Sequence, residues 1–198
     1  MDTKQRIEIL KQTLSEKRFN HSIEVMKTAI KLAQHYKADV ATAETAGLLH
    51  DCAREIRGKL LHQTCQKHKI KLDYVTKAQP ELLHGILGVF VAREKYEVTS
   101  KDILDPIRWH TTGREKMTLL DKIIYISDFI EPGRSFEGVD EVRNIVFQDI
   151  DRAMLMALDR TIKYVMMREV YIYPETIKAR NGIISDIRAK KVIGGKYE

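Results

Sequence analysis

The spacing of apolar residues predicts helices along most of the chain. Over residues 2–18, apolar positions recur at intervals of three and four, with charged residues between them. The polar stretch 18–22 interrupts this pattern, and we expect Asn20 to cap a second helix that runs to about Tyr36. Asp39 is placed to cap a third helix, which is apolar and rich in small residues. The first fifty residues therefore predict three helices.

The rest of the chain continues the helical pattern. We expect further helical segments over residues 60–65, 72–78, 81–95, 101–110, 118–130 and, as one or two helices, 139–168. Ser100 can cap one of these helices, and Thr118 with Asp121 forms a capping-box variant at the start of another. Gly113 suits a left-handed position after a helix. Because no alternating strand pattern stands out, the sequence predicts an all-α protein.

Length and patterning favour a single folded domain with a tail. The chain has 198 residues, which is enough for one sizeable core. Pro174 interrupts the helical pattern, and the remainder is polar with one weak helical stretch. We therefore expect one domain over residues 1–174 and a less ordered polar extension over residues 175–198.

Composition narrows the classes of function. The net charge of +6 is spread along the chain without interleaved aromatic residues, which argues against a dedicated nucleic-acid-binding module. No apolar run is long enough to cross a bilayer, and the N-terminal residues lack the apolar segment of a secretory signal. Cys52 and Cys65 form no CxxC motif and indicate reduced thiols, so we expect a cytoplasmic protein.

One apolar segment carries the most informative polar residues. The predicted helix that includes residues 43–49 ends in His50 and Asp51, side by side. A buried His–Asp pair is costly without a partner, and a divalent cation would supply one. Other side chains of the same kinds lie near predicted helix ends, at His21, His84, His110 and Asp128. Helices of a bundle can direct such residues inward to a shared metal site.

These six residues suggest two ions. His21, His50, Asp51 and Asp128 would hold one ion, and Asp51 would bridge to a second ion held by His84 and His110. Two adjacent cations suit hydrolysis of phosphoesters or phosphoanhydrides. Nitrogen and oxygen ligands without thiolate fit iron, manganese, cobalt or zinc better than calcium. The alternative is that each histidine is an ordinary core or helix-end residue.

Several residues beside the candidate ligands could bind phosphate. The cations are Lys17, Arg18, Arg54 and Arg134, and the neutral donors are Thr111, Thr112 and the backbone of Gly113. Arginine suits bidentate contact with phosphate, although each cation could equally be a solvated surface charge. Asp121 lies two helical turns before Asp128 and could orient a ligand histidine, but we favour a helix-start role. We assign the remaining histidines, His35, His62 and His68, to the surface.

The order His21, His50-Asp51, Asp128 resembles the HD-domain superfamily of metal-dependent phosphohydrolases. The flanking motifs make the resemblance more specific: RFNHS at 18–22, AGLLHDCAR at 46–54, HG at 84–85, WHTTG at 109–113 and DFIEPGR at 128–134. Together they resemble the bacterial YqeK family over about residues 5–170. The resemblance implies an HD-domain helical bundle with a dinuclear metal centre, in which iron is favoured. His21, His50, Asp51 and Asp128 match the core ligands, and His84 and His110 match the additional histidines of dinuclear members.

The resemblance also implies an activity, namely symmetrical cleavage of diadenosine tetraphosphate into two ADP. A metal-bridging hydroxide would be the nucleophile, and the catalytic residues would be Asp51 and Arg54. The phosphate chain would be held by Arg54 and Arg134, with Lys17 or Arg18. One alternative is an HD phosphohydrolase acting on mononucleotides or a guanosine alarmone. Another is a non-catalytic helical module that binds RNA or protein. The expected partner is a small nucleotide, and a homodimer is one open oligomeric state.

Overall fold

The computed structural model describes residues 1–194 and contains helices and loops, with no strand in that range. The helices are α1 (Thr3–Thr13), α2 (Glu16–His35), α3 (Val40–Leu49), α4 (Gly58–Lys67), α5 (Tyr74–Ala78), α6 (Leu83–Tyr96), α7 (Lys101–Trp109), α8 (Leu119–Ile130), α9 (Val139–Ile145), α10 (Ile150–Met167) and α11 (Pro174–Gly194). A 3₁₀ turn, Pro80–Leu82, precedes α6. The all-α expectation is confirmed.

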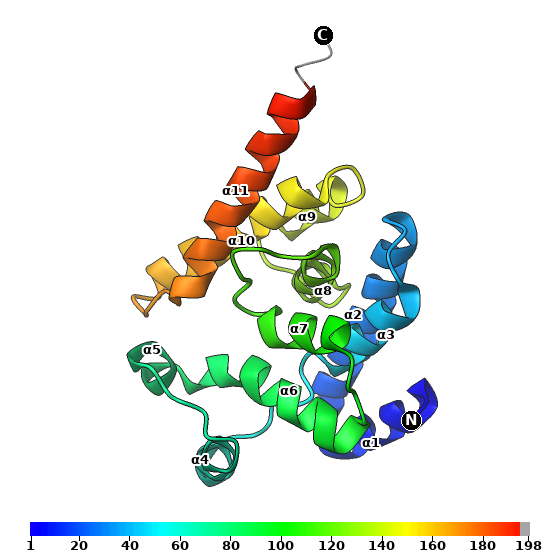
Figure 1. The fold of residues 1–198 in the computed structure, drawn as a ribbon, viewed down its shortest axis with the longest axis vertical. Helices are drawn as coiled ribbons and strands as arrows, with labels where there is room; N and C mark the ends of the chain where they lie inside the picture. The colour runs from blue at the N-terminus through cyan, green and yellow to red at the C-terminus, as the bar shows by residue number, and fades with distance from the viewer. Residues whose placement is uncertain (195–198) are drawn as a thin grey trace.

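Helix α8 lies at the centre of the fold. It contacts α2, α3, α7, α9 and α10 (Figure 1). Ile123, Ile124 and Ile126 of this helix are completely buried, and Asp121, Lys122 and Ser127 are buried beside them. Helices α4, α5 and α6 form a separate layer on the other side of α7 (Figure 1). Residues far apart in the sequence, on α2, α3, α6, α7 and α8, therefore converge near the middle of the molecule.

Local capping chemistry fixes several helix starts as predicted. The Asp39 carboxylate accepts a hydrogen bond from the Thr42 amide at the start of α3. Thr118 and Asp121 form the predicted capping box at the start of α8. Gly113 has a φ of +66°, as expected for a left-handed position.

The predicted helix break at residues 18–22 is wrong. Helix α2 begins at Glu16 and passes through that stretch without interruption, so Asn20 is not a cap. The start is set instead by Glu55, whose carboxylate accepts hydrogen bonds from the amide and hydroxyl of Ser15. This partner lies 40 residues away in sequence, so local pattern could not reveal it.

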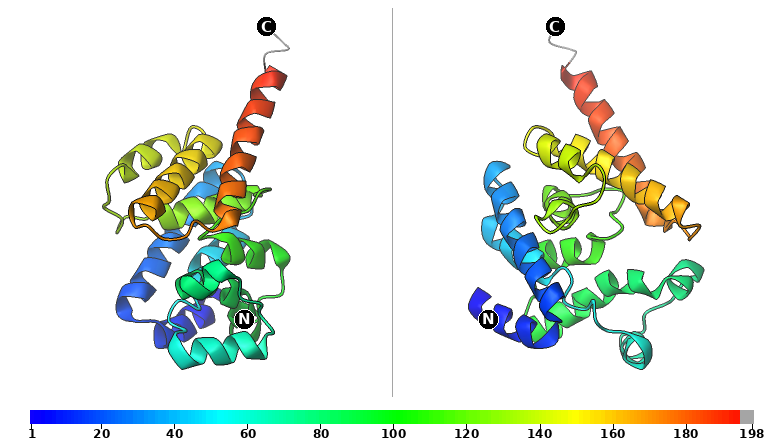
Figure 2. Two further views of the ribbon diagram at one scale, coloured as in Figure 1. Left: turned by 90° about the vertical axis from the view of Figure 1, so that its left-hand side faces the viewer. Right: turned by 180° about the vertical axis from the view of Figure 1, so that it is seen from behind.

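The expectation of a less ordered tail is also wrong for residues 175–194, which are helical. Pro174 occupies the first position of α11, where a missing amide proton costs nothing. Ala179 and Ile183 of this helix are buried in the core beside residues of α8 and α10. The end of α11 extends beyond the other helices in each view (Figure 2). The boundary at residue 174 stays a prediction, and residues 195–198 lie outside the described part.

Within residues 1–194, no helix is both long enough and apolar enough to cross a bilayer. Of the histidines assigned to the surface, His35 and His62 are exposed. His68 is half-buried and stacks on Phe90, with the ring centroids 4.1 Å apart.

Candidate metal centre

Two helices end in histidines that are oriented in the same way. His50 follows the last residue of α3, and its Nδ1 lies 2.7 Å from the Gly47 carbonyl oxygen. His110 follows α7, and its Nδ1 lies 2.8 Å from the Ile107 carbonyl oxygen. These carbonyls have no partner within the helix, so each histidine donates its Nδ1 proton to one of them. Each Nε2 then carries a lone pair that points away from the helix end.

His21 is oriented by a carboxylate. It projects from the second turn of α2, and its Nδ1 lies 3.2 Å from Oε1 of Glu131. Glu131 is buried directly after α8, and its other carboxylate oxygen accepts a hydrogen bond from the Gly133 amide. A carboxylate in this position fixes the tautomer of a ligand histidine and makes it more basic. The sequence analysis did not assign Glu131 this role, although its place three residues after Asp128 was a usable signal.

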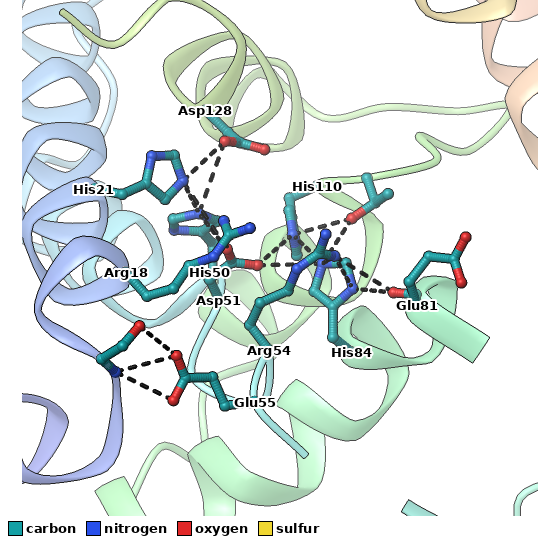
Figure 3. A network of polar contacts seen from close by, with 12 residues as sticks. Arg18, His21, His50, Asp51, Arg54, Glu55, Glu81, His84, His110 and Asp128 are labelled. Carbon is teal, nitrogen blue, oxygen red and sulfur yellow. Dashed lines mark hydrogen bonds and ion pairs between the residues drawn. The ribbon is translucent and has the colours of Figure 1, made fainter. Parts of the chain in front are cut away.

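The Asp51 carboxylate lies at the centre of the cluster (Figure 3). Its Oδ1 is 3.2 Å from His84 Nε2 and 3.5 Å from His110 Nε2. Its Oδ2 is 3.8 Å from His50 Nε2 and 4.0 Å from His21 Nε2. Each oxygen thus faces a different pair of histidines, which is the arrangement required of a bridging ligand.

Asp128 completes the group around His21 and His50. Its Oδ1 lies 3.1 Å from His21 Nε2 and 4.0 Å from His50 Nε2. Arg134 donates from Nη2 to the same carboxylate and from Nε to the Asp128 backbone carbonyl at 2.9 Å. Arg134 therefore holds the last turn of α8 in place beside the cluster.

On the other side of Asp51, the imidazoles of His84 and His110 face each other. Their Nε2 atoms are 2.9 Å apart, and the Thr111 hydroxyl lies 3.0 Å from both. Arg54 Nη1 lies 2.8 Å from His84 Nδ1. The Arg54 guanidinium therefore contacts the edge of the cluster, and the structure brings all six candidate ligands together (Figure 3).

Burial and charge set the protonation states of these groups. Burial lowers the pKa of His50 to about 4 and that of His84 to about 3, so both are neutral near pH 7. Burial alone would raise the pKa values of Asp51 and Asp128. The neighbouring histidines, with Arg134 beside Asp128, outweigh burial and hold both values well below the usual carboxyl range. His50 and His84 are therefore neutral imidazoles beside ionised carboxylates, the forms that bind metal.

The atoms that face one another around His21 and His50 require a positive charge between them. His50 Nε2 and the carboxylate oxygens of Asp51 and Asp128 all carry lone pairs and no proton. The Nε2 atoms of His21 and His50 are only 3.2 Å apart. Burial lowers the pKa of His21, but the hydrogen bond and charge of Asp128 outweigh burial and raise it. A proton on His21 or a metal cation meets this need. The mixed nitrogen and oxygen donor set fits a transition metal.

The candidate substrate residues lie at different distances from this cluster. Arg18 donates from Nη1 to Asp51 Oδ2 at 3.1 Å, and Lys17 is exposed on the first turn of α2. Thr112 is buried and donates to the Gly113 carbonyl oxygen. A Cβ on Gly113 would lie 2.7 Å from Ala179 Cβ, so this residue faces α11.

Asp121 has the helix-start role that we favoured. Its carboxylate accepts hydrogen bonds from the Thr118 amide and from the Arg114 guanidinium, with Nη2 at 2.7 Å. These partners leave Asp121 outside the group of ligand residues.

Comparison with known proteins agrees with the geometry. The model of the HD domain matches residues 18–133. Two relatives named "Bis(5'-nucleosyl)-tetraphosphatase, symmetrical" align over nearly their whole length. The Bacillus subtilis protein is 36% identical, over 93% of this chain and 99% of its own. The Halalkalibacterium halodurans protein is 38% identical, over 90% of this chain and 95% of its own.

A solved structure from Clostridium acetobutylicum, described as a "predicted HD superfamily hydrolase involved in NAD metabolism", has the same fold. It superposes with a TM-score of 0.90 at 41% identity and covers 94% of this chain and 98% of its own. The chain therefore belongs to the HD-domain family and, within it, to the YqeK family of hydrolases.

Proposed function

We propose that this protein is a metal-dependent hydrolase that cleaves diadenosine tetraphosphate symmetrically into two ADP. Full-length similarity to two relatives named for symmetrical tetraphosphatase activity supports this substrate. The observation that carries the proposal is the position of Asp51, with one carboxylate oxygen toward each pair of histidines. We propose His21, His50, Asp51, His84, His110 and Asp128 as ligands of two divalent cations, with iron favoured.

Two cations at this site would supply Lewis acidity, which activates water and neutralises charge on phosphoryl oxygens. Symmetrical hydrolysis adds a water oxygen to one of the two central phosphorus atoms. The bond from that phosphorus to the bridging oxygen breaks, and the bridging oxygen leaves on the other half. Both products are ADP, and two protons are distributed between water and the new phosphate oxygens.

The arginines supply charge where the tetraphosphate must lie. Arg18 contacts the cluster beside Asp51, and Arg54 contacts it beside His84. Each guanidinium has five N–H donors in a planar fork, so it can bind phosphoryl oxygens while keeping its present contact. We assign Arg54 a catalytic role at the reacting phosphates and Arg18 a binding role.

Other residues hold the machinery in position. Glu131 orients His21 and Arg134 orients Asp128. The Thr111 hydroxyl lies beside the two Nε2 atoms of His84 and His110, where it can donate to a phosphoryl oxygen. We further propose that the enzyme acts in the cytoplasm, because both cysteines are free thiols buried in the core. A homodimer stays a prediction.

The test compares product formation by wild type, Asp51→Ala and His50→Ala after removal of metal and reloading with iron, manganese, cobalt or zinc. We expect ADP as the only nucleotide product from wild type, and no turnover by either variant at unchanged helix content. His62→Ala, an exposed histidine away from the cluster, is the matched control.

Two results would overturn the proposal. The first is activity retained by metal-stripped Asp51→Ala. The second is release of AMP and ATP in place of ADP, which would exclude symmetrical cleavage. A panel that includes mononucleotides and a guanosine alarmone separates this activity from the other HD phosphohydrolase hypothesis.

A further inference from the structure

A pocket opens beside one half of the metal cluster. It has a volume of about 390 Å³ and is lined by Arg54, Ile56, Arg57, Gly58, Leu61, Pro80, Glu81 and His84. Two of these residues, Arg54 and His84, belong to the site described above. The pocket is therefore continuous with the place where the reacting phosphates must lie.

The lining combines apolar walls with cationic side chains. Ile56, Leu61 and Pro80 contribute apolar surface, and both Ile56 and Leu61 belong to the small core beneath α4. Arg54 and Arg57 contribute two positive charges against the single negative charge of Glu81. Apolar walls with a few charged groups are typical of sites for small anionic molecules with an aromatic part, and the volume falls within the usual range for ligands.

The opposite side of the cluster is different. The His21 and His50 pair lies beside Arg18 and Arg134, both of which contact carboxylates of the cluster. The pocket adjoins only the His84 side, through His84 itself. A substrate with two equal halves would therefore meet different surroundings at its two ends.

We propose that this pocket binds one ADP half of the tetraphosphate substrate. The base lies against Ile56 and Leu61, and the phosphates of the same half run past Arg57 and Arg54 toward His84. Arginine also stacks on aromatic rings, so Arg57 can cover the base at the exposed edge of the pocket. The inference rests on the proposed function, and it assigns base recognition to a single side of the metal cluster.

The test measures binding of two probes to the metal-loaded protein. ADP occupies the pocket and the metal cluster, whereas inorganic pyrophosphate occupies the cluster alone. Ile56→Trp fills the pocket, and we expect it to weaken ADP binding by about 10-fold to 200-fold while pyrophosphate binding stays unchanged. In turnover with diadenosine tetraphosphate, KM rises by a similar factor and kcat changes little.

A second variant avoids any change to packing. Arg57 is exposed, and Arg57→Ala removes a charge that lines the pocket. We expect about a tenfold loss of ADP affinity, the size of one lost charge-assisted contact. Lys59→Ala is the matched control because Lys59 is an exposed cation in the first turn of α4, two residues after Arg57, and does not line the pocket.

The outcomes separate this inference from the proposed function. Unchanged ADP affinity in both variants would overturn the inference, as would equal losses for ADP and pyrophosphate. A loss in Lys59→Ala as large as that in Arg57→Ala would reduce the effect to general surface charge, which also overturns it. The proposed function fails separately, when wild type releases no ADP from diadenosine tetraphosphate.

Discussion

Asp51 stays ionised although its side chain is almost completely buried. Burial of a carboxylate is unfavourable; Arg18 donates a hydrogen bond to Asp51, and a metal cation between the carboxylate and the surrounding imidazoles would offset the remaining cost. The same residue faces both pairs of histidines, so one short side chain links the two halves of the site. The spacing of His50 and Asp51 suggested metal binding, but the direction of each carboxylate oxygen could be learned only from the three-dimensional structure.

Glu131 offers a test at the level of a single atom. Glu131→Gln keeps the size of the side chain but removes the negative charge that faces His21 Nδ1. We expect the affinity for one of the two ions to fall by about 10-fold to 100-fold. The reason is that a carboxylate hydrogen-bonded to a ligand histidine makes that histidine more basic. Competition with a calibrated chelator measures the affinity of each ion. Glu137→Gln, an exposed acid in the loop after α8, is the control. Equal affinities in wild type and Glu131→Gln would show that Glu131 does not support His21.

At the scale of helices, close approach of backbones sets the distance between ligands. Gly85 on α6 faces α7, and a Cβ there would lie 2.7 Å from the Arg108 carbonyl oxygen. Gly85 follows His84, and Arg108 lies two residues before His110. The absence of a side chain at residue 85 therefore allows the two imidazoles to meet.

Gly85→Ala should separate α6 from α7. We expect a loss of about 1–3 kcal/mol in the free energy of unfolding, which is typical of overpacking, and weaker binding of the ion beside His84. Gly88→Ala on the same helix is the matched control, because its Cβ would approach a side-chain methyl of Ile107 that can shift more easily. Urea denaturation and metal titration measure the two effects. If Gly88→Ala reduced metal binding as much as Gly85→Ala, the spacing between the helices would not be the cause.

The predicted and observed helices differ for identifiable reasons. Caps such as Asp39 and Thr118 act within one turn, so sequence alone was sufficient to place them. Polar residues around His21 looked like a helix break, yet Arg18 and His21 are polar because they contact the metal cluster, and Asn20 lies on the exposed side of α2. In α11 only a narrow stripe, including Ala179 and Ile183, is buried, so the apolar signal was too weak to predict a helix.

At the scale of the whole molecule, the metal ligands connect separate parts of the fold. His21 comes from α2, His84 from α6 and Asp128 from α8, while His50 and His110 follow α3 and α7. Ions bound by all of these helices stabilise only the folded state. Removal of metal should therefore lower overall stability as well as activity.

We expect chelation to lower the melting temperature by about 5–10 °C. A ligand at 100 times its Kd contributes roughly 2.7 kcal/mol to stability. For a chain of this size, each kcal/mol corresponds to about 2–4 °C. Thermal denaturation with and without chelator measures the shift. His50→Ala should show a clearly smaller shift, because one site has lost a ligand. A chelator effect of the same size in that variant would assign the stabilisation to a metal bound elsewhere.

A second buried polar group connects the C-terminal helices to α8. The Asp151 carboxylate on α10 accepts a hydrogen bond from Lys122 of α8 at 2.8 Å and another from Lys190 of α11. Asp151 and Lys122 are buried, whereas Lys190 is exposed. Burial raises the pKa of Asp151, but the two lysines outweigh burial and hold that pKa below its ordinary value. Asp151 therefore stabilises the fold while it is ionised.

This pairing predicts a specific response to pH. Because the folded pKa lies below the unfolded value of roughly 3.9, the stabilisation is present above that pH and is lost as pH falls through the folded pKa.

Lys122→Ala leaves a buried carboxylate with one exposed partner and should lower the free energy of unfolding by about 3 kcal/mol at pH 7. Lys190→Ala should cost less than about 1 kcal/mol, because the exposed amine is screened by solvent. In Lys122→Ala the folded pKa of Asp151 rises toward its unfolded value, so less stability is lost on acidification than in wild type, and the cost of the substitution shrinks as the pH falls. Urea denaturation at a series of pH values measures both effects, and Asp151→Asn should flatten the acid limb. Equal costs for the two lysine variants would mean that Asp151 does not depend on its buried partner.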